Sequence, residues 1–326
     1  MAYTYDQGTN GVGRLTTVTE TAADGTTVMQ TTQYAYDQRG RLKGETRNLA
    51  GLAYVTAYNY DAYTGRLLSM SYPSGRVLNY SYDALGRISQ ISTTAQPGQG
   101  GQTQLLAFGV TYHPFGGVKG YTLGNNRTIT RPYDQDGRIA SYTLGNTSIS
   151  VGYDNASRII SLLDTVNAAN SNSYGYDGLD RLTSASVPST NYGYGYDLTG
   201  NRLSRNSGSA TELTTVSSTS NRISQVAGGT TRAFSYDSNG STTNDGNNTY
   251  AYDARGRMAS SQSGIGTTSY QVGANGQRVR KTSTLGDTVF HYDAQGKLIA
   301  ETTPAGALKK EYLYLLDLLV GVTVQQ

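Results

Sequence analysis

One phrase recurs along the whole sequence and limits what the chain can fold into. Its clearest copy is Tyr34-Ala-Tyr-Asp-Gln-Arg-Gly-Arg-Leu42. The two tyrosines are two residues apart, so on a strand they share one face. Asp37 begins a tight turn, because its short carboxylate can accept hydrogen bonds from backbone amides two residues on. Gly40 stands where a type I turn followed by a left-handed residue requires positive φ. Each copy therefore predicts one β-hairpin.

Tyr-Asp dipeptides mark the copies and recur at intervals that are often between 20 and 23 residues. Such a period identifies a repeat architecture. Longer gaps contain decayed copies, such as the one around Tyr112. The dipeptides begin at Tyr5, Tyr36, Tyr60, Tyr82, Tyr133, Tyr153, Tyr176, Tyr196, Tyr236, Tyr252 and Tyr292.

Four positions of each copy are expected to build the hairpin: the tyrosine, the aspartate, the glycine and the arginine. In the best-preserved copies these structural repeat residues are Tyr36, Asp37, Gly40, Arg41, Tyr60, Asp61, Gly65, Arg66, Tyr82, Asp83, Gly86, Arg87, Tyr133, Asp134, Gly137, Arg138, Tyr196, Asp197, Tyr252, Asp253, Gly256 and Arg257.

Two copies depart from the pattern at the glycine position, where they carry Ser157 and Asp180. Aspartate tolerates the left-handed region better than serine does, so we expect the turn at Ser157 to conform least well. Ile139 falls on the opposite parity from Ala140, Tyr142 and Leu144, which predicts a β-bulge near the Arg-Ile step.

The phrase resembles the RHS/YD-repeat family, which comprises polymorphic-toxin shells, toxin-complex cages and the related teneurins. The best matches are Tyr36–Leu42, Tyr82–Ile88, Tyr133–Ile139, Tyr196–Leu203 and Tyr252–Met258. The resemblance implies an all-β fold, in which a repeat array of antiparallel β-hairpins forms a long twisted, spiralling sheet. The family's cages contain more hairpins than this chain, so we expect a partial or open shell.

Composition favours a thin wall over a packed globule. Apolar residues make up 36% of the chain, and Tyr (28) replaces Trp (0) and Phe (4) as the aromatic residue. We expect the tyrosines to form two columns, with contacts between neighbouring aromatic rings. Alternation with Ser and Gly favours tyrosines that face inward over an outward, adhesive face. The columns are Tyr34, Tyr58, Tyr80, Tyr174, Tyr194 and Tyr250, and Tyr36, Tyr60, Tyr82, Tyr176, Tyr196 and Tyr252.

The charge pattern argues against nucleic-acid binding. Net charge is only +3, and the arginines are spread one to a repeat, each usually following an aspartate in its own turn. Ion pairs within the turns are the simpler interpretation. No run of about 20 apolar residues that could span a membrane is present, and the absence of cysteine excludes disulfides and thiolate metal sites.

The sequence offers no catalytic, cofactor or metal site. His113 and His291 each replace an ordinary repeat position and are far apart in sequence. Motifs for nucleophilic, zinc or nucleotide chemistry are absent. The turn aspartates could form a row that holds a cation, but the arginine of each repeat should neutralise it. Family members often carry a self-cleaving core and a toxin after the repeats, and neither motif occurs here. We therefore expect no enzyme.

The chain is interpreted as a single array over residues 1–326. Surface insertions are possible at 96–104, which is rich in Gly and Gln, and at 205–220 and 240–249, where Ser, Thr, Gly and Asn accumulate. A terminal strand over 311–324 is the most apolar segment and needs a cover or a partner. Met1 stands inside a copy of the repeat. Either this methionine is not part of the natural sequence, or domains that precede the repeats are missing.

Two functions fit this pattern. The first is a non-enzymatic structural shell segment of a larger secreted or surface RHS-type protein, which encloses or displays a cargo or toxin domain. The alternative is an extracellular adhesin, or a self-assembling surface filament that binds glycans or its own copies through end strands. Either would be extracellular or at the cell surface, and its partners would be the flanking domains or cargo of the longer polypeptide.

Overall fold

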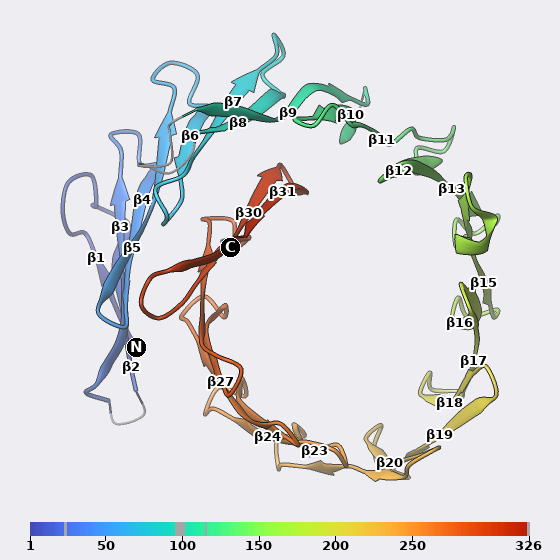
Figure 1. Cartoon of the computed structure of the whole chain (residues 1–326). Helices are drawn as coiled ribbons and strands as arrows, with labels where there is room; N and C mark the ends of the chain where they lie inside the picture. The colour runs from blue at the N-terminus through green and yellow to red at the C-terminus, as the bar shows by residue number, and fades with distance from the viewer. Residues whose placement is uncertain (23–24, 95–101, 115, 325–326) are drawn as a thin grey trace. The chain divides into compact units, whose positions relative to one another are not determined.

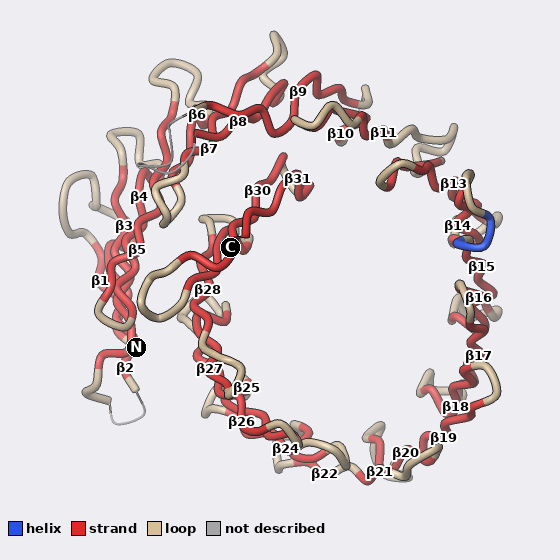
Figure 2. Tube along the Cα trace, viewed as in Figure 1, coloured by secondary structure: helices blue, strands red, loops and turns tan. Residues whose placement is uncertain are grey.

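The computed structural model describes residues 1–22, 25–94, 102–114 and 116–324, and it is built almost entirely of antiparallel hairpins (Figure 2). The predicted all-β hairpin array is confirmed. The strands follow one another in sequence order within three sheets of 11, 10 and 10 strands. Of the described residues, only Ala168–Asn170 form a helix, the 3₁₀ turn η1, and none of the described helices is long and apolar enough to cross a membrane.

The first sheet contains several of the clearest copies of the repeat, and its strands are given in sequence order. They are β1 (Ala2–Tyr5), β2 (Leu15–Thr21), β3 (Val28–Tyr36), β4 (Leu42–Leu49), β5 (Leu52–Tyr60), β6 (Leu67–Ser71), β7 (Val77–Tyr82), β8 (Ile88–Thr94), β9 (Thr103–Tyr112), β10 (Val118–Leu123) and β11 (Thr128–Thr130).

The second sheet holds β12 (Ser141–Leu144), β13 (Thr147–Tyr153), β14 (Ile159–Asp164), β15 (Asn172–Tyr176), β16 (Leu182–Val187), β17 (Thr190–Tyr196), β18 (Arg202–Ser207), β19 (Ala210–Val216), β20 (Ile223–Ala227) and β21 (Arg232–Ala233). The third holds β22 (Ser235–Tyr236), β23 (Thr242–Asn244), β24 (Thr249–Tyr252), β25 (Met258–Ser263), β26 (Gly266–Val272), β27 (Arg278–Ser283), β28 (Thr288–Tyr292), β29 (Leu298–Thr302), β30 (Leu308–Leu315) and β31 (Leu318–Val324).

A bulge follows most of the well-preserved turns. Tyr36 pairs with Leu42, whereas Ala35 pairs with Gly44, so one residue of the returning strand is left over. The same shift occurs between Gly152 and Tyr153 in the pairing of β13 with β14. At the Arg138–Ile139 step, where the parity of the sequence predicts a bulge, the structure has an isolated bridge between Tyr133 and Ile139, and β12 begins only at Ser141. A bulge at that step therefore stays a prediction.

The chain divides into two compact units, which are described separately. Unit 1 comprises Met1–Thr111, Tyr121–Arg127 and Thr268–Gln326, and unit 2 comprises Tyr112–Gly120 and Thr128–Thr267. Unit 1 joins the two ends of the sequence: β27–β30 pack against the early strands, as the hydrogen bonds below show (Figure 1). Unit 2 is a run of hairpins in sequence order.

Three expectations about segments need adjustment. Residues 205–220, expected as an irregular insertion, instead contain a regular hairpin, in which Ser207 pairs with Ala210 across a two-residue turn. Residues 240–249 include β23 and the turn after it. Within 96–104, residues 96–101 lie outside the described residues, and β9 begins at Thr103.

The apolar end of the chain is a hairpin, not one strand. Leu316 has φ of 52° and breaks the run, so Leu315 pairs with Leu318 across a tight turn. Leu313 and Leu315 of β30 are buried. On β31, Leu319, Val322 and Val324 are exposed.

Candidate functional site

The turn aspartate organises each hairpin through its side chain. Asp37 Oδ1 accepts hydrogen bonds from the amides of Arg39 and Arg41, each at 2.9 Å, and Oδ2 accepts one from Arg41 Nε at 2.6 Å. Gly40 closes the turn with φ of 78°. Hydrogen bonds to Arg41 and Arg39 hold the pKa of Asp37 below its usual value, against desolvation, which is the largest effect and acts to raise it. The charged groups of the repeat therefore serve the turn.

The aspartate–arginine pair recurs in most of the predicted copies. The pairs are Asp37–Arg41, Asp83–Arg87, Asp134–Arg138, Asp154–Arg158, Asp177–Arg181 and Asp253–Arg257. Two of the best-preserved copies differ. Asp61 accepts hydrogen bonds from Thr64 near Gly65, and Asp197 accepts them from Thr199 and Asn201.

The repeat tyrosine connects each hairpin to the one before it. The hydroxyl of Tyr60 donates to the carbonyl of Leu42 at 2.9 Å, and the guanidinium of Arg41 lies 4.5 Å from the centre of its ring. Tyr196 makes the same contacts with Leu182 O, at 2.7 Å, and Arg181, at 4.8 Å. Equivalent hydroxyl bonds are made by Tyr36, Tyr82, Tyr153, Tyr176, Tyr236, Tyr252, Tyr292 and Tyr314.

This arrangement differs from the expected column of ring–ring contacts. Equivalent tyrosines lie two strands apart, or about 10 Å, because neighbouring strands are about 4.8 Å apart. Aromatic pairs need ring centres within about 7 Å. The arginine of the preceding repeat reaches the ring instead, and such a cation–π contact contributes about 0.5–1 kcal/mol at exposed sites.

Ser157 adopts the left-handed conformation, so the turn expected to conform least well keeps its geometry. Its φ is 63°, and Asp180 has the same value. Both side chains bind the arginine of the preceding repeat: Arg138 Nη1 donates to Ser157 Oγ at 2.9 Å, and Arg158 Nη1 donates to Asp180 Oδ1 at 2.7 Å. A polar partner therefore offsets the strain that glycine would avoid.

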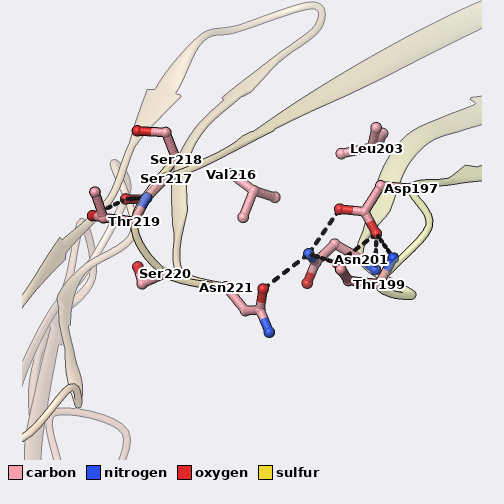
Figure 3. Close-up of a pocket in the computed structure, with 10 residues that line it drawn as sticks. All are labelled: Asp197, Thr199, Asn201, Leu203, Val216, Ser217, Ser218, Thr219, Ser220 and Asn221. Carbon is pink, nitrogen blue, oxygen red and sulfur yellow. Dashed lines mark hydrogen bonds between the residues drawn. The ribbon is translucent and has the colours of Figure 1, made fainter.

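A depression of about 490 Å³ lies between two neighbouring turns of unit 2 (Figure 3). Its charged group, Asp197, is already satisfied: the amide of Asn201 and other donors hold its pKa at about 2. Asn201 Nδ2 in turn donates to Asn221 Oδ1 at 3.3 Å. The polar side chains of this depression therefore join one turn to the next and serve the structure of the hairpin array.

A second kind of site occurs in unit 1, where strands distant in sequence meet. We call it the seam: the contacts that β2–β7 and their turns make with β27–β30 and their turns. Tyr72 Oη donates to Tyr312 O at 2.9 Å, and the amide of Ala294 donates to Tyr58 Oη at 2.7 Å. An apolar cluster of Leu49, Tyr54 and Val289 fills part of it.

An ion pair between a fully buried carboxylate and a mostly buried arginine crosses the seam. Glu311 is 0% exposed, and its Oε2 accepts a hydrogen bond from Arg76 Nε at 2.6 Å. Ser74 Oγ and Thr323 Oγ1 also donate to this carboxylate. Removal of one partner from such a pair leaves a buried charge without compensation, so this pair ties β30 firmly to the turn between β6 and β7.

His291 lies at the centre of the seam and is also 0% exposed. Arg47 Nη2 is 3.1 Å from its Nδ1, and its Nε2 is 3.0 Å from Thr302 Oγ1. Because arginine can only donate, Nδ1 accepts and Nε2 carries the proton. Burial, assisted by the charge of Arg47, lowers the pKa of His291 to about 3. The ring is therefore neutral at ordinary pH.

His113 has a different role in unit 2. Its ring stacks on that of Tyr133, with centroids 3.5 Å apart, and its Nε2 lies 2.8 Å from Arg131 O. Across the part of the chain that the structure describes, no cluster of three or more His, Asp or Glu side chains is arranged to hold a metal ion.

Two family profiles match the chain. The profile described as teneurin YD-shell matches residues 108–266, and the one described as RHS repeat matches residues 60–97 and 274–308. Both matches fall on the hairpins whose turns and tyrosine contacts are described above. The chain belongs to the RHS/YD-repeat family.

Solved RHS/YD-type structures share its fold. The chain matches the structure of the Photorhabdus luminescens Tc holotoxin pore carrying a TccC3 mutation, with a TM-score of 0.68 and 16% identity. The match covers 96% of this chain and 22% of that one. It matches TcdB2-TccC3 over 93% of this chain and 22% of that one, with a TM-score of 0.57 and 16% identity. The chain thus spans about a fifth of the length of these chains. No curated protein matches the sequence.

Sequence reasoning located the RHS/YD turns but missed the seam. His291 and the buried Glu311 stand at ordinary positions of weak repeats, and nothing in the sequence near His291 indicates burial. For Glu311 one signal was available: it is an acidic residue that begins the most apolar segment of the chain, and a buried acidic residue usually requires a partner.

Proposed function

We propose that this chain is a wall segment of a larger exported protein and that the wall encloses or displays a cargo domain without performing chemistry. The observation that carries this proposal is the use of charge in the repeats. Six aspartate–arginine pairs bind within their own turns, and the tyrosines bind the preceding hairpin. The charged groups of these six turns are thus committed to architecture.

Several features support a role in a larger assembly. The family assignment and the fold support a shell-forming role, and the solved chains that it resembles are several times longer. Flanking domains or cargo of a longer polypeptide are therefore its natural partners, and export to the cell surface or beyond is the corresponding location.

Cryo-electron microscopy of the chain fused to a disordered guest tests this proposal. Density for the guest against one face of a thin β wall is the expected result, together with cleavage of the guest by protease at least tenfold more slowly than cleavage of the free guest. Unchanged cleavage would favour display over enclosure. Guest density that makes no consistent contact with the wall would contradict the proposal.

A self-associating surface filament is the second candidate, and the last strand favours it. β31 pairs with β30, and Val322 and Val324 on it are 46% and 60% exposed. Exposed apolar strands at a sheet edge can pair with another chain. Filaments that lengthen with protein concentration would support this candidate, and a monomer at all concentrations would exclude it.

A further inference from the structure

A cleft of about 290 Å³ lies at the seam of unit 1, and its acidic groups take no part in the contacts described so far. It is lined by Tyr34, Glu45, Arg47, Asn275, Gln277 and Asp293, among others. An inner cavity of about 20 Å³ shares five of these residues and also reaches Gln30. Residues from strands and from turns, at both ends of the sequence, line the cleft and the inner cavity.

Asp293 is a turn aspartate without the usual arginine. Its Oδ1 accepts hydrogen bonds from the amides of Gln295, at 2.9 Å, and Lys297, at 2.8 Å. In six other turns an arginine binds the second oxygen. Here the basic residue is Lys297, whose Nζ instead binds Asp317, at 2.9 Å, and Leu316 O, at 2.7 Å. The negative charge of Asp293 is left to the cleft.

Glu45 adds a second carboxylate to the same cleft. Burial raises its pKa, Arg47 acts to lower it, and Asp293 acts to raise it further. Within the described part of the chain, its carboxylate accepts no hydrogen bond. Two acidic groups that repel each other thus line one cleft, and a cation between them would relieve the repulsion.

Arg47 provides an independent indication of a ligand. Its side chain is buried, with only 6% of the residue exposed. Nη2 binds His291, but the buried Nε finds no acceptor, and the nearby Gln30 Oε1 finds no donor. A buried polar group without a partner is costly. The inner end of the cleft therefore favours an oxygen acceptor, while its outer part favours a cation.

We propose that this cleft binds an ammonium group with an adjoining carbonyl or carboxylate oxygen, as in the amino terminus of a peptide or a free amino acid. The ammonium group lies between Glu45 and Asp293. The oxygen is directed toward Arg47 Nε, and Asn275 and Gln277 supply amide donors. The volume fits a group the size of one residue. This site goes beyond the shell role and does not depend on it.

Ligand-observed NMR titration of the intact chain with three probes tests the proposal: glycinamide, glycine and N-acetylglycinamide. Glycinamide and glycine should bind, and N-acetylglycinamide, which lacks the ammonium, should bind at least tenfold more weakly. Tighter binding of glycine would identify a free amino acid as the ligand, and tighter binding of glycinamide a peptide terminus. Equal binding of all three probes, or of none, would overturn the proposal.

Variants locate the site. Glu45→Gln and Asp293→Asn should each weaken glycinamide binding at least tenfold and leave the thermal unfolding temperature within a few degrees of the wild type. Asp237→Asn is the matched control, because Asp237 is a turn aspartate that also accepts backbone amides and forms no ion pair among the described residues, but lies in unit 2. Unchanged binding in the first two variants, or an equal loss in the control, would place the ligand elsewhere.

Discussion

The seam of unit 1 and the hairpin run of unit 2 are made of the same repeat but are stabilised differently. In unit 2, the described strands bury few side chains, such as Ile149, Ala185 and Val226, and neighbouring hairpins are joined by tyrosine and arginine. In unit 1, the same tyrosine and arginine contacts join neighbouring hairpins, and β27–β30 also pack against β2–β7. The repeat residues therefore explain how neighbouring hairpins are joined, and residues that depart from the repeat explain the contacts of the seam.

The ion pair across the seam gives the largest expected difference between the two regions. Glu311→Ala leaves the guanidinium of Arg76, only 11% of whose side chain is exposed, without its carboxylate partner and should reduce the free energy of unfolding by about 3–5 kcal/mol. Its matched control is the pair of Arg205 and Glu212 in unit 2, at 3.2 Å, where both side chains are more than a third exposed. Glu212→Ala should cost at most about 1 kcal/mol. Denaturant titrations of both variants measure this, and equal costs would contradict the contrast.

The buried histidine of the seam predicts that the stability of the protein depends on pH. The pKa of His291 is about 3 when folded, against 6.5 for a free histidine. Between these values the unfolded chain binds more protons, so stability is complete above pH 6.5 and falls as the pH decreases. The slope should approach about 1.4 kcal/mol per pH unit.

His291→Asn removes this titration and provides the control. The stability of the wild type should decline from pH 6.5 to 5, where the turn aspartates remain ionised, and that of the variant should stay nearly flat. Parallel profiles would show that His291 does not titrate in this way.

These two sets of residues also separate what the sequence could predict from what it could not. Turn geometry is local: Asp37, Gly40 and Arg41 specify it within five residues, so it was predictable from one copy. The seam is not local. Arg47 and His291 lie 244 positions apart in sequence, and their contact depends on how many hairpins separate them and how each one twists.

Glycine substitutions sharpen the account of the wall. Gly86 and Gly137 have φ of 81° and 78°, so alanine is strained at either position. At Gly86 a Cβ atom would also lie 2.3 Å from Arg66 Nη2, whereas at Gly137 it would meet nothing within 4 Å. Gly86→Ala should therefore cost about 0.5–1 kcal/mol more than Gly137→Ala, which is the value of the displaced cation–π contact with Tyr82. Thermal unfolding of the two variants compares them directly.

An effect of similar size concerns the hydroxyl that joins neighbouring hairpins. Tyr196→Phe removes the bond to Leu182 O but keeps the ring beneath Arg181, so it should cost about 0.5–1.5 kcal/mol. Tyr63→Phe is the control, because the Tyr63 side chain is 91% exposed. Chemical denaturation should find the control unchanged, and an equally neutral Tyr196→Phe would show that the hydroxyl does not couple the repeats.

Hydrogen–deuterium exchange of the wild type and Glu311→Ala tests most directly whether the seam holds the two ends of the chain together. If it does, the variant loses protection in β6–β7 and in β30 together, although these strands are far apart in sequence, while β16–β19 exchange as in the wild type. Loss of protection in β30 alone, with β6–β7 unchanged, would contradict this account.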